Sequence, residues 1–287
     1  MLYDMQPFVH KCLQFVQIMT SPRLDRLSAL LEGLEPRVEA LPGNGVLRHF
    51  APSGEAMLHL HLVSQGRVRL SAAGFPDALV DGPALIICRA ATAHTIEPLT
   101  TQPAGVLLSA RAHLDGPVGA LFISEFDRPA VLNPVQEDAS LSHVLALIAT
   151  ELREQRCGQP ALLNRAGDIL FIAILRHLVA NPRRSVGLFS GLADARISRA
   201  LVALHAAPQA RWTLEAMAEE AAMSRTAFAT RFREVMATPP GKYLAQLRLS
   251  IARRTVESGL GLKRAARDSG YRNSSALSRA LSRAAHP

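Results

Sequence analysis

The chain has few cysteines, no long apolar run and none of several common catalytic signatures. Its three cysteines, Cys12, Cys88 and Cys157, are widely spaced and form no CxxC pair. This pattern favours buried thiols in a reduced, cytoplasmic setting, with a redox-sensing thiol as the alternative. No stretch approaches the roughly eighteen uncharged apolar residues of a membrane span, and no export signal opens the chain, so we expect a soluble, unexported protein. The G-x-S-x-G, P-loop and H-E-x-x-H motifs are absent, and no cofactor is expected.

The length and the charge distribution indicate two domains with different roles. A chain of 287 residues with 48% hydrophobic and 20% charged residues can bury two cores. From Ala195 onward there are 16 Lys and Arg against 6 Asp and Glu, whereas the rest has 16 against 18. The C-terminal part therefore carries a charge of +10 and the N-terminal part −2. This asymmetry fits a C-terminal part that binds a polyanion, although a solvated basic face would look the same.

The C-terminal part contains two copies of one helix-turn-helix pattern. In the first copy, a short amphipathic helix over Leu214–Ala221 precedes Ser224, which we expect to cap a second helix. The second copy begins about 48 residues later with Leu262–Ser269, and Asn273 takes the place of Ser224. A helix from about Tyr243 to Ser258 would connect them and hold two recognition helices about one DNA turn, roughly 34 Å, apart. The pattern and the charge together predict DNA binding.

The N-terminal part predicts a β-structure between helices. An amphipathic helix is expected from Pro22 through Leu34. Short apolar runs broken by turn residues then predict the strands of a sandwich or barrel. The runs are Val46–Phe50, Met57–Val63, Arg67–Ser71, Leu85–Cys88 and Gly105–Ser109. Further helices are expected near Leu141–Arg156, Ala161–Ala180 and Ile197–His205.

These stretches resemble a known family over nearly the whole chain. WTLEAMAEEAAMSRTAFATRFREVMATPPGKYL, RLSIARRTVESG and GLKRAARDSGYRNSSALSRALSR resemble the DNA-binding domain of AraC/XylS-type transcriptional regulators. The N-terminal stretches DRLSALLEGLEPRVEALPG, HLHLVSQGRVRL, VDGPALIICRAATAHTI and LLNRAGDILFIAILRHL resemble the cupin-like effector domain often joined to it.

The resemblance implies an α+β fold in two domains: an N-terminal cupin-like β-barrel with flanking helices and a C-terminal all-α double helix-turn-helix. The expected boundaries are 1–182 for the barrel domain, 183–193 for the linker and 194–287 for the DNA-binding domain. The implied function is a transcription regulator, in this family more often an activator, under the control of a small effector. The expected partners are double-stranded DNA, RNA polymerase, an unknown small-molecule effector and a second copy of the chain, without a membrane. A cytoplasmic, nucleoid-associated bacterial location follows.

The resemblance also assigns residues that read bases. These residues are Thr226, Ala229 and Thr230 in the first recognition helix, and Ser275, Ala276 and Arg279 in the second. Arg279 is the strongest of them, because a guanidinium can make a bidentate contact to guanine. A further set is expected at DNA phosphates, with simple exposure as the alternative for its arginines. This set is Thr213, Arg225, Arg231, Arg233, Arg248, Arg253, Arg254 and Arg283.

The N-terminal domain carries a candidate effector or metal site. His59 and His61 lie two apart in a predicted strand and so face the same way. With Gln65 and His94 they resemble the metal-binding motifs of cupin enzymes, but Gln65 stands where an acidic ligand is expected. We therefore favour histidines without metal. A metal-dependent cupin-type enzyme and a thiol-based redox sensor remain the alternatives.

The second repeat departs from the family pattern at its end. The first repeat continues through MATPPGKYL, whereas the second stops at AAHP. We therefore expect the last helix to have less packing support than its counterpart.

Overall fold

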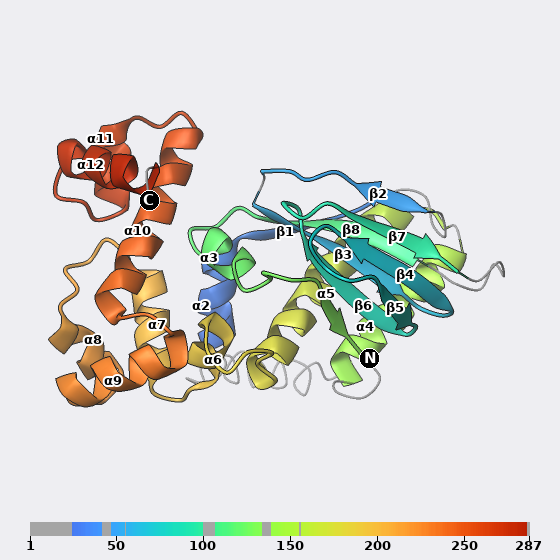
Figure 1. The fold of residues 1–287 in the computed structure, drawn as a ribbon, viewed down its shortest axis with the longest axis horizontal. Helices are drawn as coiled ribbons and strands as arrows, with labels where there is room; N and C mark the ends of the chain where they lie inside the picture. The colour runs from blue at the N-terminus through green and yellow to red at the C-terminus, as the bar shows by residue number, and fades with distance from the viewer. Residues whose placement is uncertain are drawn as a thin grey trace, which may run out of the picture.

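The computed structural model describes residues 25–41, 47–54, 56–99, 107–133, 139–154 and 156–285. Within them, an N-terminal part built on two antiparallel sheets lies beside a C-terminal part made of helices (Figure 1). The predicted α+β, two-domain fold class is confirmed. Cys12 and the expected helix start at Pro22 lie outside the described residues.

The two sheets form the core of the N-terminal domain. The first has the strand order β1-β8-β3-β6-β9 and the second has the order β2-β7-β4-β5. The first sheet consists of β1 (Pro36–Ala40), β3 (Met57–Val63), β6 (Ala84–Arg89), β8 (Leu107–Leu114) and β9 (Ala130–Leu132). The second consists of β2 (Arg48–Phe50), β4 (Arg67–Ala72), β5 (Ala78–Asp81) and β7 (His94–Pro98). All five predicted runs overlap strands, whereas β1, β5, β7 and β9 were not predicted individually.

Strand β3 is buried on both faces, and this determines where its histidines lie. Leu58, Leu60 and Leu62 belong to the core that the first sheet shares with the helices. Val63 belongs instead to the core between the two sheets. Because side chains alternate along a strand, His59 and His61 share the inner face with Val63.

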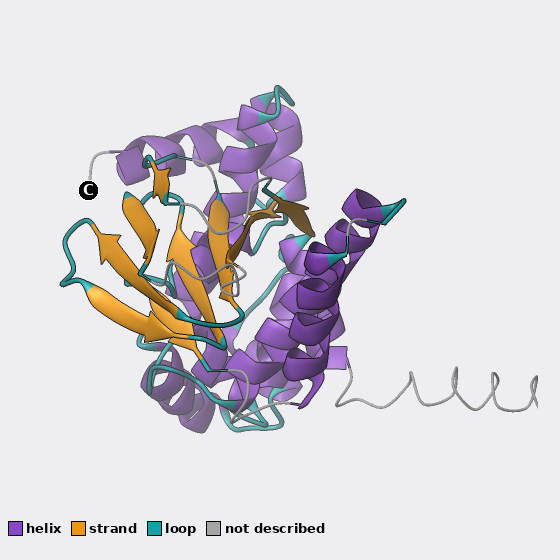
Figure 2. Ribbon diagram, turned by 90° about the vertical axis from the view of Figure 1, so that its right-hand side faces the viewer, coloured by secondary structure: helices purple, strands orange, loops and turns teal. Residues whose placement is uncertain are grey.

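Helices cover the outer face of the first sheet. Helix α5 (Gln159–Ala180) packs on β1, and α4 (Ala139–Arg153) packs on α5. Helices α2 (Asp25–Leu34) and α3 (Gly119–Ile123) contribute side chains to the same core. Helix α5 packs closely on β1, since a Cβ on Gly167 would lie 2.7 Å from Cγ1 of Val38. Figure 2 shows the strands gathered together, with helices to their right and above them.

The C-terminal domain is entirely helical. Its helices are α6 (Leu188–Ala193), α7 (Ile197–Ala206), α8 (Leu214–Glu220), α9 (Arg225–Met236), α10 (Pro240–Glu257), α11 (Leu262–Asp268) and α12 (Ser274–Ala285). The segment 183–193, expected as a linker, contains α6, whose Leu188, Phe189 and Leu192 are buried. These side chains belong to the main core, so residues 188–193 are packed against the rest of the protein and do not form an exposed linker. Among the described helices, none is long and apolar enough to cross a membrane.

Candidate functional site

The first helix-turn-helix consists of α8 and α9, and side-chain caps fix where each helix begins. Thr213 Oγ1 accepts a hydrogen bond from the amide of Ala216 at 3.1 Å, and Ser224 Oγ accepts one from Ala227 at 3.3 Å. Phe228 and Phe232 are fully buried. The expected base readers Thr226 and Thr230 are exposed on the same helix, and Ala229 is half-buried.

The second helix-turn-helix, α11 and α12, repeats this geometry. Asn273 Oδ1 accepts a hydrogen bond from the amide of Ala276 at 2.8 Å, as the sequence predicts. The turns of the two copies also correspond, because Ala222 and Gly270 both have positive φ, at 50° and 74°. Ser275 and Arg279 are exposed, and Ala276 is half-buried.

Helix α10 joins the two copies, which pack at its opposite ends (Figure 1). Tyr243, Leu244 and Leu247 belong to the main core together with Phe228 and Phe232. Ala252, near the other end, belongs to the small core of the second copy. At 1.5 Å per residue, the 18 residues of α10 span about 27 Å. Successive major grooves on one face of DNA, the separation expected for the two recognition helices, are roughly 34 Å apart.

A buried pair links α10 to α7. His205 Nε2 lies 2.6 Å from Tyr243 Oη, and both side chains are buried. Burial lowers the pKa of His205 to about 4 and raises the pKa of Tyr243. Both groups are therefore neutral at pH 7 in the folded protein.

We expect this buried histidine to make the protein sensitive to acid. The pKa of His205 is lower in the folded state than its unfolded value of 6.5. The unfolded state therefore binds the proton first as the pH falls, and stability is lost between pH 6.5 and about 4. From pH 7 to pH 5 the loss is about 2 kcal/mol from this group. Urea unfolding of His205→Gln at both pH values should show a smaller loss than wild type by this amount. His143→Gln, which alters an exposed histidine on α4, should behave like wild type, and equal pH dependence in all three proteins would refute the assignment.

Most of the expected phosphate contacts have partners within the chain. Arg225 pairs with Glu215 at 2.6 Å, Arg231 with Asp194 at 2.9 Å, and Arg254 with Glu35 at 3.2 Å. Arg248 donates to the carbonyls of Pro208 and Ala210, Arg253 to that of Ala284, and Arg283 to that of Arg279. Arg233 and Thr213 are exposed. Binding of phosphate by the carboxylate-paired arginines requires an exchange of partners, and the DNA contacts of this set stay predictions.

The two domains contact each other through α2, which packs on α7, through α5, which packs on α6, and through α10, which lies against α3. Ser250 Oγ on α10 donates to the carbonyl of Pro117 at 3.2 Å, and Arg254 reaches Glu35 just after α2. The carboxylate of Glu125, which follows α3, accepts a hydrogen bond from the amide of Leu188 at 2.7 Å. Burial raises the pKa of Glu125, although this hydrogen bond opposes the shift. Helix α10, which joins the two helix-turn-helix copies, thus lies directly against the N-terminal domain.

Glu125→Ala is expected to destabilise the protein because it removes the acceptor of a buried amide. Leu188 is 2% exposed, so its unpaired N–H would cost about 1–3 kcal/mol of unfolding free energy. Glu125→Gln keeps an acceptor oxygen and loses the buried charge, so its stability should be close to that of wild type. Urea unfolding at pH 7 tests this pair, and equal destabilisation in both variants would contradict the role of the hydrogen bond.

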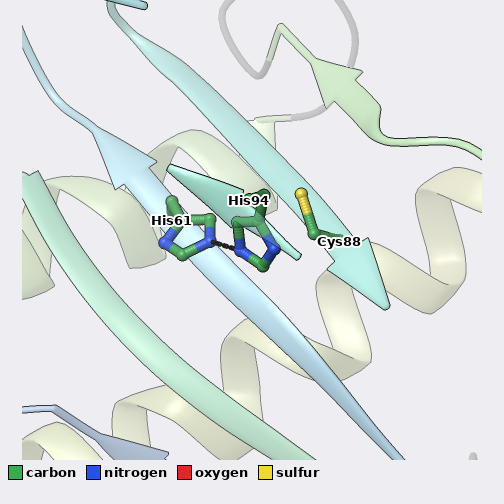
Figure 3. Close-up of side chains that lie close together, drawn as sticks. All are labelled: His61, Cys88 and His94. Atoms are coloured by element: carbon green, nitrogen blue, oxygen red, sulfur yellow. Dashed lines mark hydrogen bonds between the residues drawn. The ribbon is translucent and has the colours of Figure 1, made fainter. Parts of the chain in front are cut away.

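Three buried histidines gather between the sheets, as the sequence indicates. His59, His61 and His94 are each at most 3% exposed. His61 and His94 lie with their Nε2 atoms 3.0 Å apart (Figure 3). His94 Nδ1 donates to the carbonyl of Thr92 at 2.7 Å, which leaves Nε2 of the neutral ring as the acceptor from His61. His61 Nδ1 then accepts from Ser109 Oγ at 3.0 Å, so neutral His61 and His94 have all their ring nitrogens paired.

Cys88, rather than Gln65, joins this cluster. The ligand atoms of His61, Cys88 and His94 lie within 4.8 Å of one another, and Figure 3 shows the thiol beside His94. Two nitrogens and one sulfur form a donor set that suits a borderline metal such as Zn²⁺. Gln65 is exposed in the turn after β3, so its expected place beside the histidines is wrong. The spacing of the motif could not show that Gln65 lies outside the cluster, because it does not indicate where β3 ends.

The described cysteines differ in their surroundings. Cys88 is buried, and burial raises the pKa of its thiol to about 12. Such a thiol is protonated at neutral pH and is a poor nucleophile. Cys157 is exposed, whereas Cys12 lies outside the described residues.

An open pocket of about 830 Å³ lies beside the histidine cluster, at one end of the space between the sheets. His59 is part of its lining and is 3% exposed. Phe50 contacts all three histidine rings, with centroid distances of 4.6 to 4.8 Å. The outer lining is basic and includes Arg37, Arg48 and Arg111. These arginines come from three different strands, β1, β2 and β8, so no local pattern in the sequence indicates that they lie close together.

Comparison with protein families gives two matches. The family described as Cupin matches residues 25–180, and the family described as Helix-turn-helix domain matches residues 217–286.

Several curated transcription regulators are similar to this chain. The chain is 28% identical over 188 residues to the HTH-type transcriptional regulator AlkR of Acinetobacter baylyi, covering 64% of this chain and 61% of that protein. It is 33% identical over 141 residues to a putative AraC-like transcription regulator of Streptomyces lividans, covering 48% and 46%. The chain therefore matches about half to three fifths of the length of these relatives.

Among solved structures, ToxT from Vibrio cholerae with a bound unsaturated fatty acid is similar at a TM-score of 0.37. The identity is 11%, and the match covers 86% of this chain and 90% of that one.

Proposed function

The chain belongs to the cupin family through its N-terminal domain and carries an AraC-type helix-turn-helix domain, and from this premise we propose that it is a sequence-specific, DNA-binding transcription regulator. The observation that carries the proposal is the pair of recognition helices, α9 and α12, at opposite ends of α10. Each presents exposed polar side chains, and each is fixed by a side-chain cap. One chain can in this way place two helices into successive major grooves.

The charge of the C-terminal part supports this proposal. Its excess of ten positive charges suits a DNA surface, and the release of counterions would make binding depend on salt. We assign base reading to Thr226, Ala229, Thr230, Ser275, Ala276 and Arg279. Arg233, Arg253 and Arg283 are exposed and have no carboxylate partner among the described ion pairs, so they are the readiest phosphate contacts.

We assign control of DNA binding to the N-terminal domain, without catalytic turnover. An effector bound there acts on α10 through the contacts of Glu35 and Pro117 with Arg254 and Ser250. It must bind two arrangements of the domains with different affinity to have an effect. Activation through contact with RNA polymerase, in the bacterial cytoplasm at the nucleoid, is the mode of action that we propose.

We further propose a homodimer formed by α4 and α5. Leu147 on α4 and Leu162 and Ile169 on α5 are large apolar side chains with 36% to 51% exposure. Leu162 and Ile169 lie seven residues apart on one face of α5. Dimerisation would raise the effective concentration of the DNA-binding domains at paired sites. Only monomers in size measurements with and without DNA would contradict it.

Selection of genomic DNA fragments by the purified protein at two salt concentrations tests the proposed function. We expect a motif with two half-sites about one helical turn apart, retained at the higher salt. Binding that is unspecific and is lost at the higher salt would contradict sequence-specific regulation.

A further inference from the structure

The pocket beside the histidine cluster is lined by residues that the strand register places in rows. Arg37 on β1 lies opposite His113 on β8, which lies opposite Met57 on β3. In the next row inward, Glu39, Arg111 and His59 are opposite one another. Residues opposite each other on neighbouring strands project to the same face of a sheet. Both rows therefore face the pocket, and strand β2 of the other sheet adds Arg48 and Phe50.

Positive charge dominates this lining. Three arginines face one carboxylate, Glu39, whose Oε2 lies 3.9 Å from His113 Nε2. Arg37 is 4.0 Å from Asp115. Among the described residues, Arg111 forms no ion pair, although it is directly beside His59 in the register. Arg48 is half-buried, so its charge acts in a region with little water to screen it.

An unpaired polar atom points to a missing partner in the same place. His59 is 3% exposed, and its Nδ1 has no hydrogen-bond partner among the described residues. An unpaired buried nitrogen costs free energy, whereas the rings of His61 and His94 are paired as described above. A ligand that enters the pocket can supply the missing hydrogen bond.

The apolar part of the lining limits the kind of anion. Leu41, Leu47, Phe50 and Met57 line the pocket together with the arginines. Inorganic phosphate has no apolar surface to pack against these side chains. An organic acid would cover them and present a carboxylate, which pairs well with guanidinium groups. A volume of about 830 Å³ lies within the usual range for small-molecule sites.

We propose that this pocket binds a small organic acid, with its carboxylate against Arg48 and Arg111 and its apolar body against Phe50 and Met57, and that this acid is the effector. Only the effector role rests on the proposed function; the binding itself does not. The ligand contacts β1, which packs on α5, and β8, which leads directly towards Pro117 and α3. Occupancy of the pocket therefore acts on the segment that Ser250 of α10 contacts.

The test compares two acids with their uncharged amides on the full chain. Isothermal titration with benzoate and octanoate, and with benzamide and octanamide, should show saturable binding of one acid per chain. That acid should bind roughly tenfold or more tightly than its amide, because the amide lacks the charge-assisted hydrogen bonds. Inorganic phosphate should not compete with it. No saturable binding of either acid, equal binding of acid and amide, or full competition by phosphate would each overturn the proposal.

Matched variants locate the site. Arg111→Gln and Arg48→Gln should each weaken binding of the acid roughly tenfold or more. Arg111 is exposed, so its variant should fold even if Arg48→Gln does not. Arg165→Gln changes an arginine of α5 that is not part of the lining, and it should bind like wild type. Equal binding by Arg111→Gln and Arg165→Gln would overturn the assignment.

DNA selection with the same protein preparations separates this inference from the proposed function. A selected motif without acid binding refutes the pocket and leaves the regulator intact. Acid binding without a selected motif supports the pocket as a binding site and refutes the regulator, and with it the effector role.

Discussion

Leu277→Ala is expected to unfold the second helix-turn-helix while the rest of the chain stays folded. The fully buried residues of this small core are Ala252, Ala265, Ala266 and Leu277, so leucine is the only large one among them. Truncation of a buried leucine costs about 2–5 kcal/mol, depending on how far the cavity collapses. A core of this size cannot lose that much unfolding free energy and remain folded. The first copy is held more firmly, because its Phe228 and Phe232 are part of the main core.

Amide hydrogen exchange measures this local unfolding directly. Amides of 262–285 should lose protection in Leu277→Ala, and those of 214–257 should keep most of theirs. Leu281→Ala is the matched control, because Leu281 lies on the same helix and is only partly buried against the same core. The control should retain protection in α12. Uniform loss of protection along the whole chain of Leu277→Ala would contradict the independence of the second copy.

Arg279→Ala is expected to remove discrimination at one base pair. Arg279 is exposed on α12, in the helix that we expect to enter the major groove. Loss of a bidentate contact to guanine should cost about 1–3 kcal/mol, roughly 5- to 150-fold, on the preferred site. Binding to sites with another base at that position should change little.

Arg283→Ala serves as the matched control on the same helix. As a phosphate contact, Arg283 should contribute equally to all sequences, so its loss should weaken every site and reduce the salt slope by about one. Competition binding on a set of single-base variants of the selected site distinguishes the two. The same sequence profile for both variants would remove Arg279 from the base readers.

Much of the C-terminal domain could be predicted because the signals there are local. A helix cap acts over three residues, so Ser224 and Asn273 were identifiable from their positions. The apolar spacing of α9 is also a local pattern, and its buried residues Phe228 and Phe232 follow it. The correspondence of the two copies extends to their turns, where Ala222 and Gly270 both have positive φ.

The N-terminal site could be predicted only in part, because it depends on contacts between distant strands. Alternation along β3 predicts that His59 and His61 face the same way, and in the structure they share the inner face with Val63. The approach of Cys88 to His94 requires the pairing of β3 with β6 and the packing of the two sheets. The basic pocket likewise needs the register of β1, β8 and β3. Short strands such as β5 and β9 have too few residues to give a periodic signal.

The contacts between the domains could not be predicted from the sequence either. Glu35 and Arg254 are 219 residues apart, and Pro117 and Ser250 are 133 apart. From the sequence, Arg254 is expected to contact a DNA phosphate. No local pattern indicates that a carboxylate of the other domain, Glu35, pairs with it. In the structure, α10 joins the two helix-turn-helix copies and also contacts the N-terminal domain.

The most direct test of the central claim is a hydroxyl-radical footprint of the protein on its selected DNA site. If α9 and α12 read successive major grooves from one face, protection should appear in two blocks about one helical turn apart. Leu277→Ala should lose one block and keep the other. A single block in the wild-type protein, or two blocks that Leu277→Ala leaves unchanged, would contradict a reader in which one chain carries two recognition helices.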